Sequence, residues 1–307
     1  MKPAQIIVRQ QSIFKETLDM EAYTFGRLNG HSTGIIMKEL VRRAITIIRN
    51  QRQSFEATVK QGYDGNMNDV FTSADNAAQE IYIKSLRECF PDIGIIAEEE
   101  SLSITATEGV SAYFTVDPLD GTKAFIRRQS SGVGSMIALV FEGKVIAAFI
   151  GDTNTQEIYG FRPGSKSVRR ITEFNNSERL TSGKRAPLIE QYVILRDRES
   201  AYSAQSRKLI DSCFKNVAID GGSIGTWFAR LWKREVAAAL LPPSWETPWD
   251  SAPTVGISLT LGYVFLRPSP DGWEEYDPIV SPEKYKRTHE TLVIHRDDLA
   301  GFHMRAA

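Results

Sequence analysis

The sequence predicts a mixed α/β (α+β) protein built from two subdomains. Amphipathic stretches with helical periodicity alternate along the chain with short apolar runs that are typical of strands. Two of those runs flank residues 142–144, whose Glu-Gly-Lys sequence predicts a β-hairpin. A polar, glycine-containing segment near residues 174–184 indicates a boundary. We therefore expect an N-terminal subdomain over residues 1–180, with most of the acids discussed below, and a C-terminal subdomain over residues 181–307.

Two helices are expected in the first third of the chain. In residues 35–50, isoleucine, leucine and alanine recur every three or four positions, and basic residues lie off that stripe. A second helix is expected to follow Thr72 and Ser73, which are favourable N-cap residues, and to end at Pro91. Residues 1–32 are polar and weakly patterned, so we expect a partly ordered lead-in there.

Short apolar runs predict the strands, and two of the strands end at acids. We expect strands over residues 93–97 and 112–116, which lead directly into Glu98 and Asp117. Residues 60–68 are polar and contain glycine, which predicts a loop. Further strands are expected at 136–141, 145–150, 158–161, 192–195, 264–268 and 290–295, and further helices at 204–214, 225–241 and 255–261.

Composition and charge argue against several classes of protein. The net charge of −1 gives no reason to expect a nucleic-acid or anionic-membrane partner. The most apolar stretch, residues 136–150, is too short and too charged to span a membrane. Two cysteines make no disulfide framework, and the first residues lack a signal-peptide pattern, so we expect a cytoplasmic protein.

The most informative segment is residues 117–122, with the sequence DPLDGT. We expect Pro118 to end the preceding strand and Gly121 to permit a tight turn, so that Asp117 and Asp120 lie close together. Two adjacent carboxylates repel each other unless a cation neutralises them, and oxygen ligands suit Mg²⁺. Backbone amides at this turn could contact phosphate oxygens. Taken alone, the segment is equally compatible with a capped turn bearing two solvated acids.

Three further segments contribute acids. Glu98 belongs to an acidic triplet after a strand, Asp75 lies in the first turn of an expected helix, and Asp250 opens a helical stretch. Each has a structural explanation when taken alone, either as a solvated surface acid or as a favourable residue at a helix start.

Together, the four segments resemble the signatures of the inositol monophosphatase family. The matches occur in the family's order and are Asp69/Thr72/Asp75, Ala97–Glu99, residues 117–125 (DPLDGTKAF) and Trp249–Ala252. The resemblance implies a layered αβαβα sandwich, a phosphoric monoester hydrolase activity on a small phosphorylated metabolite, two or three Mg²⁺ ions and inhibition by lithium. It also implies a homodimer.

The resemblance assigns roles to individual residues. Thr122 and Asp75 resemble the pair that orients and deprotonates the attacking water, and Glu98 is expected to serve both catalysis and metal binding. No covalent phospho-enzyme is required. The implied metal ligands are Glu98, Asp117, the Leu119 carbonyl, Asp120 and Asp250, and the implied substrate-binding residues are Gly121, Thr122, Gly222 and Ser223.

Three alternatives compete with this interpretation. A haloacid-dehalogenase-like phosphatase needs the spacing D-x-D, whereas residues 117–120 have D-x-x-D. A metal-binding protein that has lost turnover would lack a ligand or the Thr/Asp pair, and both are present. Residues 221–225 contain three glycines, but their spacing does not match the dinucleotide-binding fingerprint G-x-G-x-x-G.

The substrate is less well specified than the metal site. Inositol monophosphates, 3′-phosphoadenosine 5′-phosphate, histidinol phosphate and sugar phosphates all remain candidates. Inositol-specific relatives carry an acid seven positions before the aspartate of the Trp-Asp motif, where this chain has Pro243, although Glu246 could substitute. Trp245 and Trp227 could stack on a base or be buried in the core. We therefore favour a 3′(2′),5′-bisphosphate nucleotidase, with inositol-1-monophosphatase or histidinol-phosphatase as alternatives.

Overall fold

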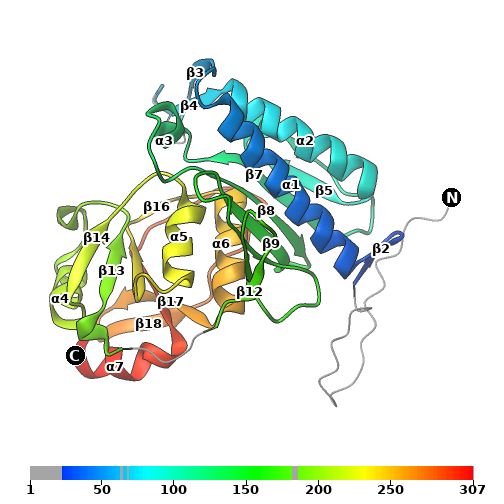
Figure 1. Cartoon of the computed structure of the whole chain (residues 1–307). Helices are drawn as coiled ribbons and strands as arrows, with labels where there is room; N and C mark the ends of the chain where they lie inside the picture. The colour runs from blue at the N-terminus through cyan, green and yellow to red at the C-terminus, as the bar shows by residue number, and fades with distance from the viewer. Residues whose placement is uncertain (1–22, 63–64, 68, 182–185, 307) are drawn as a thin grey trace, which may run out of the picture.

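The computed structural model describes residues 23–62, 65–67, 69–181 and 186–306, and the statements below concern those residues. The elements stack as five layers: two helices, an eight-stranded sheet, two helices, a six-stranded sheet and two more helices (Figure 1). The predicted mixed α/β class and the layered αβαβα arrangement are thereby confirmed. None of the described helices is long and apolar enough to cross a membrane.

The first layer consists of α1 (Gly30–Gln51) and α2 (Ser73–Cys89), which pack on each other and on one face of the larger sheet. Asn29 caps α1 by accepting a hydrogen bond from the Ser32 amide at 2.9 Å. The expectation of a partly ordered lead-in up to residue 32 is therefore wrong for its last ten residues. They form the short strands β1 (Thr24–Phe25) and β2 (Leu28–Asn29) and the start of α1, and residues 1–22 lie outside the described range.

The larger sheet has the strand order β12-β11-β10-β9-β8-β7-β5-β6. The predicted hairpin is confirmed, because β8 and β9 pair antiparallel around Glu142 and Gly143, which both have positive φ. The strands are β5 (Gly94–Ala97), β6 (Ser103–Ile104), β7 (Ala112–Asp120), β8 (Gly134–Phe141), β9 (Lys144–Asp152), β10 (Ile158–Phe161), β11 (Arg169–Ile171) and β12 (Ser177–Arg179).

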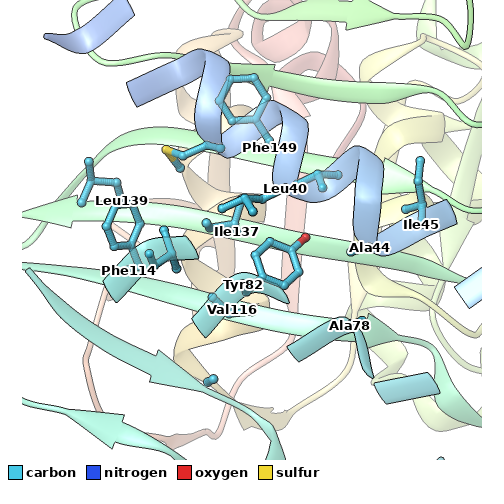
Figure 2. Close-up of a cluster of buried hydrophobic side chains, with 14 of the residues drawn as sticks. Leu40, Ala44, Ile45, Ala78, Tyr82, Phe114, Val116, Ile137, Leu139 and Phe149 are labelled. Atoms are coloured by element: carbon cyan, nitrogen blue, oxygen red, sulfur yellow. The ribbon is translucent and has the colours of Figure 1, made fainter. Parts of the chain in front are cut away.

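Alternate residues of the central strands supply two separate cores. On β8, Ile137 and Leu139 point to α1 and α2, where Leu40 and Tyr82 also lie (Figure 2). The intervening residues of β8, such as Ala138, belong to the core on the opposite face. Because side chains alternate along a strand, a sheet covered by helices on both faces needs apolar residues at every position. The uninterrupted apolar run that the sequence contains here follows from this double burial.

The middle layer holds α5 (Ile224–Trp232) and α6 (Pro248–Thr260), which contact both sheets. The smaller sheet has the order β14-β13-β15-β20-β17-β18, and α4 (Ala204–Cys213) and α7 (Leu299–Ala306) cover its outer face. Its strands are β13 (Tyr192–Leu195), β14 (Asn216–Ile219), β15 (Ala238–Leu241), β17 (Tyr263–Ser269), β18 (Gly272–Tyr276) and β20 (Thr291–His295).

The helix expected over residues 225–241 is confirmed in its first half and wrong in its second half. It ends at Trp232, a turn follows in which Arg234 has φ 67°, and Ala238–Leu241 form β15 between β13 and β20. The run Ala-Ala-Ala-Leu-Leu has high helix propensity, but a short apolar run cannot be assigned by periodicity. Burial on both faces of the sheet outweighs its local preference.

Two small hairpin-like sheets lie beside the layers. β3 (Ala57–Lys60) pairs with β4 (Asp69–Thr72), so the expected loop at 60–68 begins with the last residue of a strand. β16 (Ser244–Glu246) pairs with β19 (Tyr285–Arg287) just before α6. The larger sheet uses residues 94–179 and the smaller one residues 192–295, while the division of the chain at residue 180 stays a prediction.

Candidate active site

Two neighbouring parallel strands position the first two acids of the site. β5 and β7 pair in parallel, with Ala97 opposite Val116. The next amide, that of Glu98, donates to the Val116 carbonyl at 3.1 Å. Because Ala97 and Val116 are register partners, the residues that follow them, Glu98 and Asp117, lie next to each other. Glu98 directly follows β5, as the sequence predicts, whereas Asp117 lies inside β7 rather than at its end.

A β-bulge brings Asp120 close to Asp117. Asp117 lies opposite Met136 and Asp120 opposite Gly134, so three steps along β7 match two steps along β8. Side chains three positions apart normally point to opposite faces, and one extra residue reverses this. The expectation that Pro118 ends the strand is wrong, since β7 continues to Asp120. Proline is tolerated there because a bulge leaves residues outside the hydrogen-bond ladder.

The start of α5 binds the Asp120 carboxylate. Its oxygens accept hydrogen bonds from the Ser223 hydroxyl at 2.5 Å, the Ile224 amide at 2.9 Å and the Gly225 amide at 2.7 Å. These amides lie at the positive end of the helix dipole, which favours a carboxylate. Ser223, a predicted substrate-binding residue, is therefore engaged with a predicted metal ligand.

Three glycines allow the two halves of the site to approach at the level of the backbone. Gly121 has φ 92°, and a Cβ there would lie 2.2 Å from the Gly132 carbonyl oxygen. Gly222 has φ 76°, and its Cβ would lie 2.5 Å from the same oxygen. That oxygen also accepts a hydrogen bond from the Ser223 amide at 2.8 Å. No L-residue with a side chain fits at Gly121 or Gly222 without displacing backbone.

Asp250 comes from the first turn of α6. Thr247 is the N-cap residue and Pro248 occupies the first helical position, where its missing N–H costs nothing. The Thr247 hydroxyl donates to the Asp250 carboxylate at 2.8 Å. The Asp117 and Asp120 carboxylates come from β7, so α6 adds an acid from a distant part of the chain.

Three aspartates form a group that could hold a metal ion. Asp117, Asp120 and Asp250 each offer a carboxylate oxygen, and these atoms lie within 4.8 Å of one another. Asp117 Oδ1 is buried and has no hydrogen-bond partner among the described residues. An all-oxygen donor set with an unpartnered buried carboxylate oxygen fits a hard divalent cation such as Mg²⁺.

Burial gives these carboxylates unusually high proton affinity. It raises the pKa of Asp117 well above its ordinary value, and the neighbouring Glu98 and Asp120 charges add to the effect. Burial and the Asp120 charge raise the pKa of Asp250 to about 7. Burial likewise raises the pKa of Glu98 to about 8, although the Lys60 charge opposes it. Such mutual repulsion is relieved when a cation binds.

Asp75 and Thr122 contact each other next to this group. The Thr122 hydroxyl lies 3.2 Å from Asp75 Oδ1 and 3.2 Å from the Leu119 carbonyl oxygen. Asp75 Oδ2 also accepts from the Thr72 amide at 2.7 Å and the Thr72 hydroxyl at 2.6 Å, which completes a capping box at the start of α2. Asp75 therefore serves as a helix-start acid and as the partner of Thr122 at once. Burial raises its pKa to about 7.

Sequence reasoning missed a lysine, Lys60, that pairs with Glu98 and Glu99 beside the three aspartates. Lys60 Nζ lies 2.8 Å from Glu99 Oε1 and 3.2 Å from Glu98 Oε1. Glu99 is buried, and Gln79 holds its backbone through two hydrogen bonds of 3.1 Å. The sequence predicts only the start of a loop at Lys60, and no local pattern distinguishes it from a solvated lysine. Its partners lie 38 and 39 residues away.

A cavity of about 240 Å³ opens beside Asp250. Aromatic side chains form much of its wall, and Arg196 lies on it as well. Trp245 is 41% exposed here, whereas Trp227 is buried in the core, so only Trp245 of the two candidates remains available for stacking. The aromatic residues on the cavity wall are Phe228, Trp245, Phe265, Tyr276 and Tyr285.

Glu246 also lines the cavity, but neighbouring groups already use its carboxylate. It accepts hydrogen bonds from the Ser244 hydroxyl at 3.0 Å, the Ser251 hydroxyl at 3.0 Å and Arg287 Nε at 2.9 Å. Arg287 itself is buried and also donates to the Pro242 carbonyl at 2.8 Å. Glu246 is therefore a structural partner of β19 rather than a free acceptor for substrate hydroxyls.

Comparison with known proteins gives matches over most of the fold. The curated 3′(2′),5′-bisphosphate nucleotidase CysQ of Salmonella typhimurium is 37% identical over 79 residues, which are 26% of this chain and 32% of that protein. The chain thus matches about a third of the length of this relative. Among solved structures, extragenic suppressor protein suhB from Bartonella henselae superposes with a TM-score of 0.69 at 17% identity, over 89% of this chain and 97% of that one.

A second solved structure is a complex with ligands. It is an IMPase/NADP phosphatase complexed with Mg²⁺ and phosphate, with a TM-score of 0.65 at 15% identity, over 89% of this chain and 94% of that one. At such identities the two structures support the fold alone. The family model described as the inositol monophosphatase family matches residues 32–299. Since that range covers most of the chain, the protein belongs to the inositol monophosphatase family.

Proposed function

We propose that this protein is a Mg²⁺-dependent phosphomonoesterase that hydrolyses a small phosphorylated metabolite by direct attack of water. The observation that carries the proposal is the convergence of Asp117, Asp120 and Asp250 within 4.8 Å, with a buried Asp117 oxygen that has no partner in the described structure. An acidic group of this kind is expensive to bury unless cations compensate it.

The chain offers ligands for two or three ions. Glu98, Asp117 and the Leu119 carbonyl would hold one, and Asp117, Asp120 and Asp250 a second. Bound ions would neutralise phosphate charge and lower the pKa of a coordinated water. The α5 amides hold Asp120 in one orientation, and the Thr247 hydroxyl does the same for Asp250. The protein's own contribution is therefore a set of carboxylates whose directions are fixed before any ion arrives.

Thr122 and Asp75 are suited to orient the attacking water. When the Thr122 hydroxyl donates a hydrogen bond to Asp75, the lone pairs of the Thr122 oxygen can accept a hydrogen bond from water. Asp75, with a pKa of about 7, can take up a proton near neutral pH. The Gly121 carbonyl accepts the first amide bonds of α3 (Thr122–Ile126), and the preceding amides of Gly121 and Thr122 are proposed phosphate donors.

For the substrate, the cavity beside Asp250 favours a leaving group with an aromatic ring over a polyol such as inositol. Position 243 is proline, and the carboxylate of Glu246 is occupied by Arg287 and two serines. Polyol hydroxyls would find few unused acceptors, and a site lacking such partners discriminates against them. Trp245 offers an exposed aromatic face instead. We therefore favour 3′-phosphoadenosine 5′-phosphate, with inositol 1-phosphate and histidinol phosphate as alternatives.

The test is a comparison of kcat/KM for 3′-phosphoadenosine 5′-phosphate, inositol 1-phosphate and histidinol phosphate at equal Mg²⁺, measured by phosphate release with and without Li⁺. We expect the nucleotide to be the best of the three and Li⁺ to inhibit. A preference for inositol 1-phosphate would overturn the nucleotide assignment while leaving the phosphatase proposal intact. No phosphate release from any of them, with Mg²⁺ bound, would favour a non-catalytic metal-binding protein.

A further inference from the structure

Arg196 is a cation on the cavity wall whose hydrogen bonds are incomplete. It directly follows β13, and its backbone amide donates to the Tyr202 hydroxyl at 3.1 Å. Its guanidinium lies 5.8 Å from the centre of the Trp227 ring and donates through Nη2 to the Gly222 carbonyl. Nη1 is buried and has no partner among the described residues. A buried charged donor without an acceptor is unfavourable, so its presence calls for an explanation.

The other cation of the cavity is fully used. Arg287 donates to Glu246, Ser244 and the Pro242 carbonyl, and these contacts hold β16 on β19. Arg196 forms no ion pair within the described part of the chain, although Asp120 and Asp250 attract it through space. Of the two guanidinium groups on the cavity wall, Arg196 is thus the one with a donor to spare.

The position of Arg196 separates it from the scissile phosphate. The cavity includes Arg196 and Asp250, but its wall contains neither Thr122 nor Glu98. The phosphate is proposed to bind at the Gly121 and Thr122 amides, so the cavity receives the remainder of the substrate, beyond the bond that is cleaved. An anion that reached Arg196 would therefore be a second charged group.

We propose that Arg196 is a specificity-determining residue that binds a second anionic group, a phosphate or a carboxylate, carried by the leaving-group part of the substrate. This rests on the proposed phosphatase function and extends it. The planar fork of a guanidinium binds such groups through charge-assisted hydrogen bonds, and the Arg196 guanidinium lies 5.8 Å from the centre of the Trp227 ring. Since Nη2 already donates to the Gly222 carbonyl, Nη1 is the donor left for the anion. When cations occupy the carboxylates of Asp120 and Asp250, those groups no longer balance the Arg196 charge, and a substrate anion restores the balance.

The test compares matched pairs of substrates that differ only in the second phosphate. One pair is 3′-phosphoadenosine 5′-phosphate and adenosine 3′-phosphate, and the other is fructose 1,6-bisphosphate and fructose 1-phosphate. The readout is the ratio of kcat/KM within each pair. We expect the wild type to prefer the doubly phosphorylated member by roughly 10- to 100-fold in at least one pair, as for a charge-assisted hydrogen bond. The pair with the larger ratio identifies whether the anion belongs to a nucleotide or a sugar.

In Arg196→Gln the ratio should fall to about one, and Arg196→Lys should recover part of it, because lysine keeps the charge but loses the fork. Arg296→Gln is the matched control, since Arg296 is exposed and paired with Glu275 at 2.7 Å on another face, and it should keep the wild-type ratio. If Arg196 only supports the Gly222 turn, or contacts the scissile phosphate, both members of a pair will lose rate equally and the ratio will survive. That result would overturn the inference.

A binding measurement separates this inference from the phosphatase proposal. Calorimetry with adenosine 5′-phosphate and adenosine needs no turnover. We expect wild-type protein to bind the phosphorylated ligand more tightly by a similar factor and Arg196→Gln to bind the two ligands equally. Absence of phosphate release would count against the phosphatase proposal alone, whereas equal binding by the wild type, combined with a wild-type rate ratio near one in both pairs, would count against Arg196.

Discussion

The acids of the site form two groups that differ in how their negative charge is balanced. One group is Glu98 and Glu99, and the other is Asp117, Asp120 and Asp250. In the first group, Lys60 lies 2.8 Å from Glu99 and 3.2 Å from Glu98, so a side-chain cation is built in. In the second group, Asp120 is met by helix amides and Asp250 by a hydroxyl, while Asp117 Oδ1 has no partner in the described structure. Amides and hydroxyls stabilise a carboxylate without cancelling its charge. The Asp117 group is therefore the one that depends on an added cation.

The largest effect is expected at Asp117, which is common to both proposed ion sites. Asp117→Asn should lower turnover by about 10³-fold or more, since ion-based charge stabilisation is worth several kcal/mol in the transition state. The metal-free variant should unfold at the same temperature as the wild type or higher, because one of several repelling acids is gone. Phosphate release and calorimetric Tm measure the two outcomes. Wild-type-like hydrolysis by this variant would refute the two-ion arrangement.

The next largest effect concerns the pair that faces the water. Thr122→Ala and Asp75→Asn should each lower kcat by roughly 10²-fold with a smaller change in KM, as for a lost acid–base group. Steady-state kinetics with a saturating substrate measure this split. A change confined to KM would remove both residues from the catalytic role.

Thr72→Ala is the control for Asp75, because it removes the Thr72 hydroxyl, one of the two helix-cap donors to Asp75, but leaves the Thr72 amide and the contact with Thr122. It should cost about 1 kcal/mol of stability, as for a lost N-cap, and have little effect on kcat. Equal losses of kcat in Thr72→Ala and Asp75→Asn would mean that Asp75 acts through the start of α2 alone.

A smaller effect is expected at the group that has its own cation. Lys60→Met should lower the Mg²⁺ concentration needed for half-maximal activity by roughly threefold to tenfold, because the ammonium group both repels an incoming ion and competes with it for Glu98. Lys123→Met is the control, since Lys123 is exposed and lies 4.0 Å from Asp69. A weaker Mg²⁺ requirement in both variants, or in neither, would contradict the proposed asymmetry.

The smallest expected effect is a pH dependence of stability in the metal-free protein. The pKa values of Asp75 and Asp250 are raised to about 7 and that of Glu98 to about 8, whereas unfolded carboxyl groups titrate near 4. Between about pH 4 and 8 the folded state binds more protons, so the free energy of unfolding falls as pH rises. In EDTA, Tm should drop by a few degrees from pH 5 to pH 8, and Mg²⁺ should reduce that drop. A Tm that rises toward pH 8 in EDTA would contradict the assignment.

The acids were predictable because local sequence determines their positions. Glu98 and Asp117 follow short apolar runs, and Asp75 and Asp250 occupy helix starts, so each could be placed from its neighbours in the chain. Lys60, Arg196 and Arg287 were not singled out, because their partners lie far away in the sequence and a basic residue in a loop has many ordinary explanations.

The errors in secondary structure have a similar origin. The buried strand Ala238–Leu241 consists of residues that favour helices, and only its neighbours β13 and β20 make it a strand. The continuation of β7 through Pro118 depends on the register of β8, which the sequence of residues 117–122 does not contain. Features that the local sequence determines therefore agree with the structure better than features that a partner strand determines.

The contact of Gly121 and Gly222 with the Gly132 carbonyl has a mechanical consequence. Side chains hop between rotamers and yield under load, but backbone atoms in direct contact do neither easily. Here the strand that carries Asp120 and the turn that leads into α5 meet backbone to backbone, so the distance between them cannot change by side-chain rearrangement. A methyl group at either glycine would push these two backbone segments apart. Forcing the backbone apart there would disturb the hydrogen bonds that hold the Asp120 carboxylate against the start of α5.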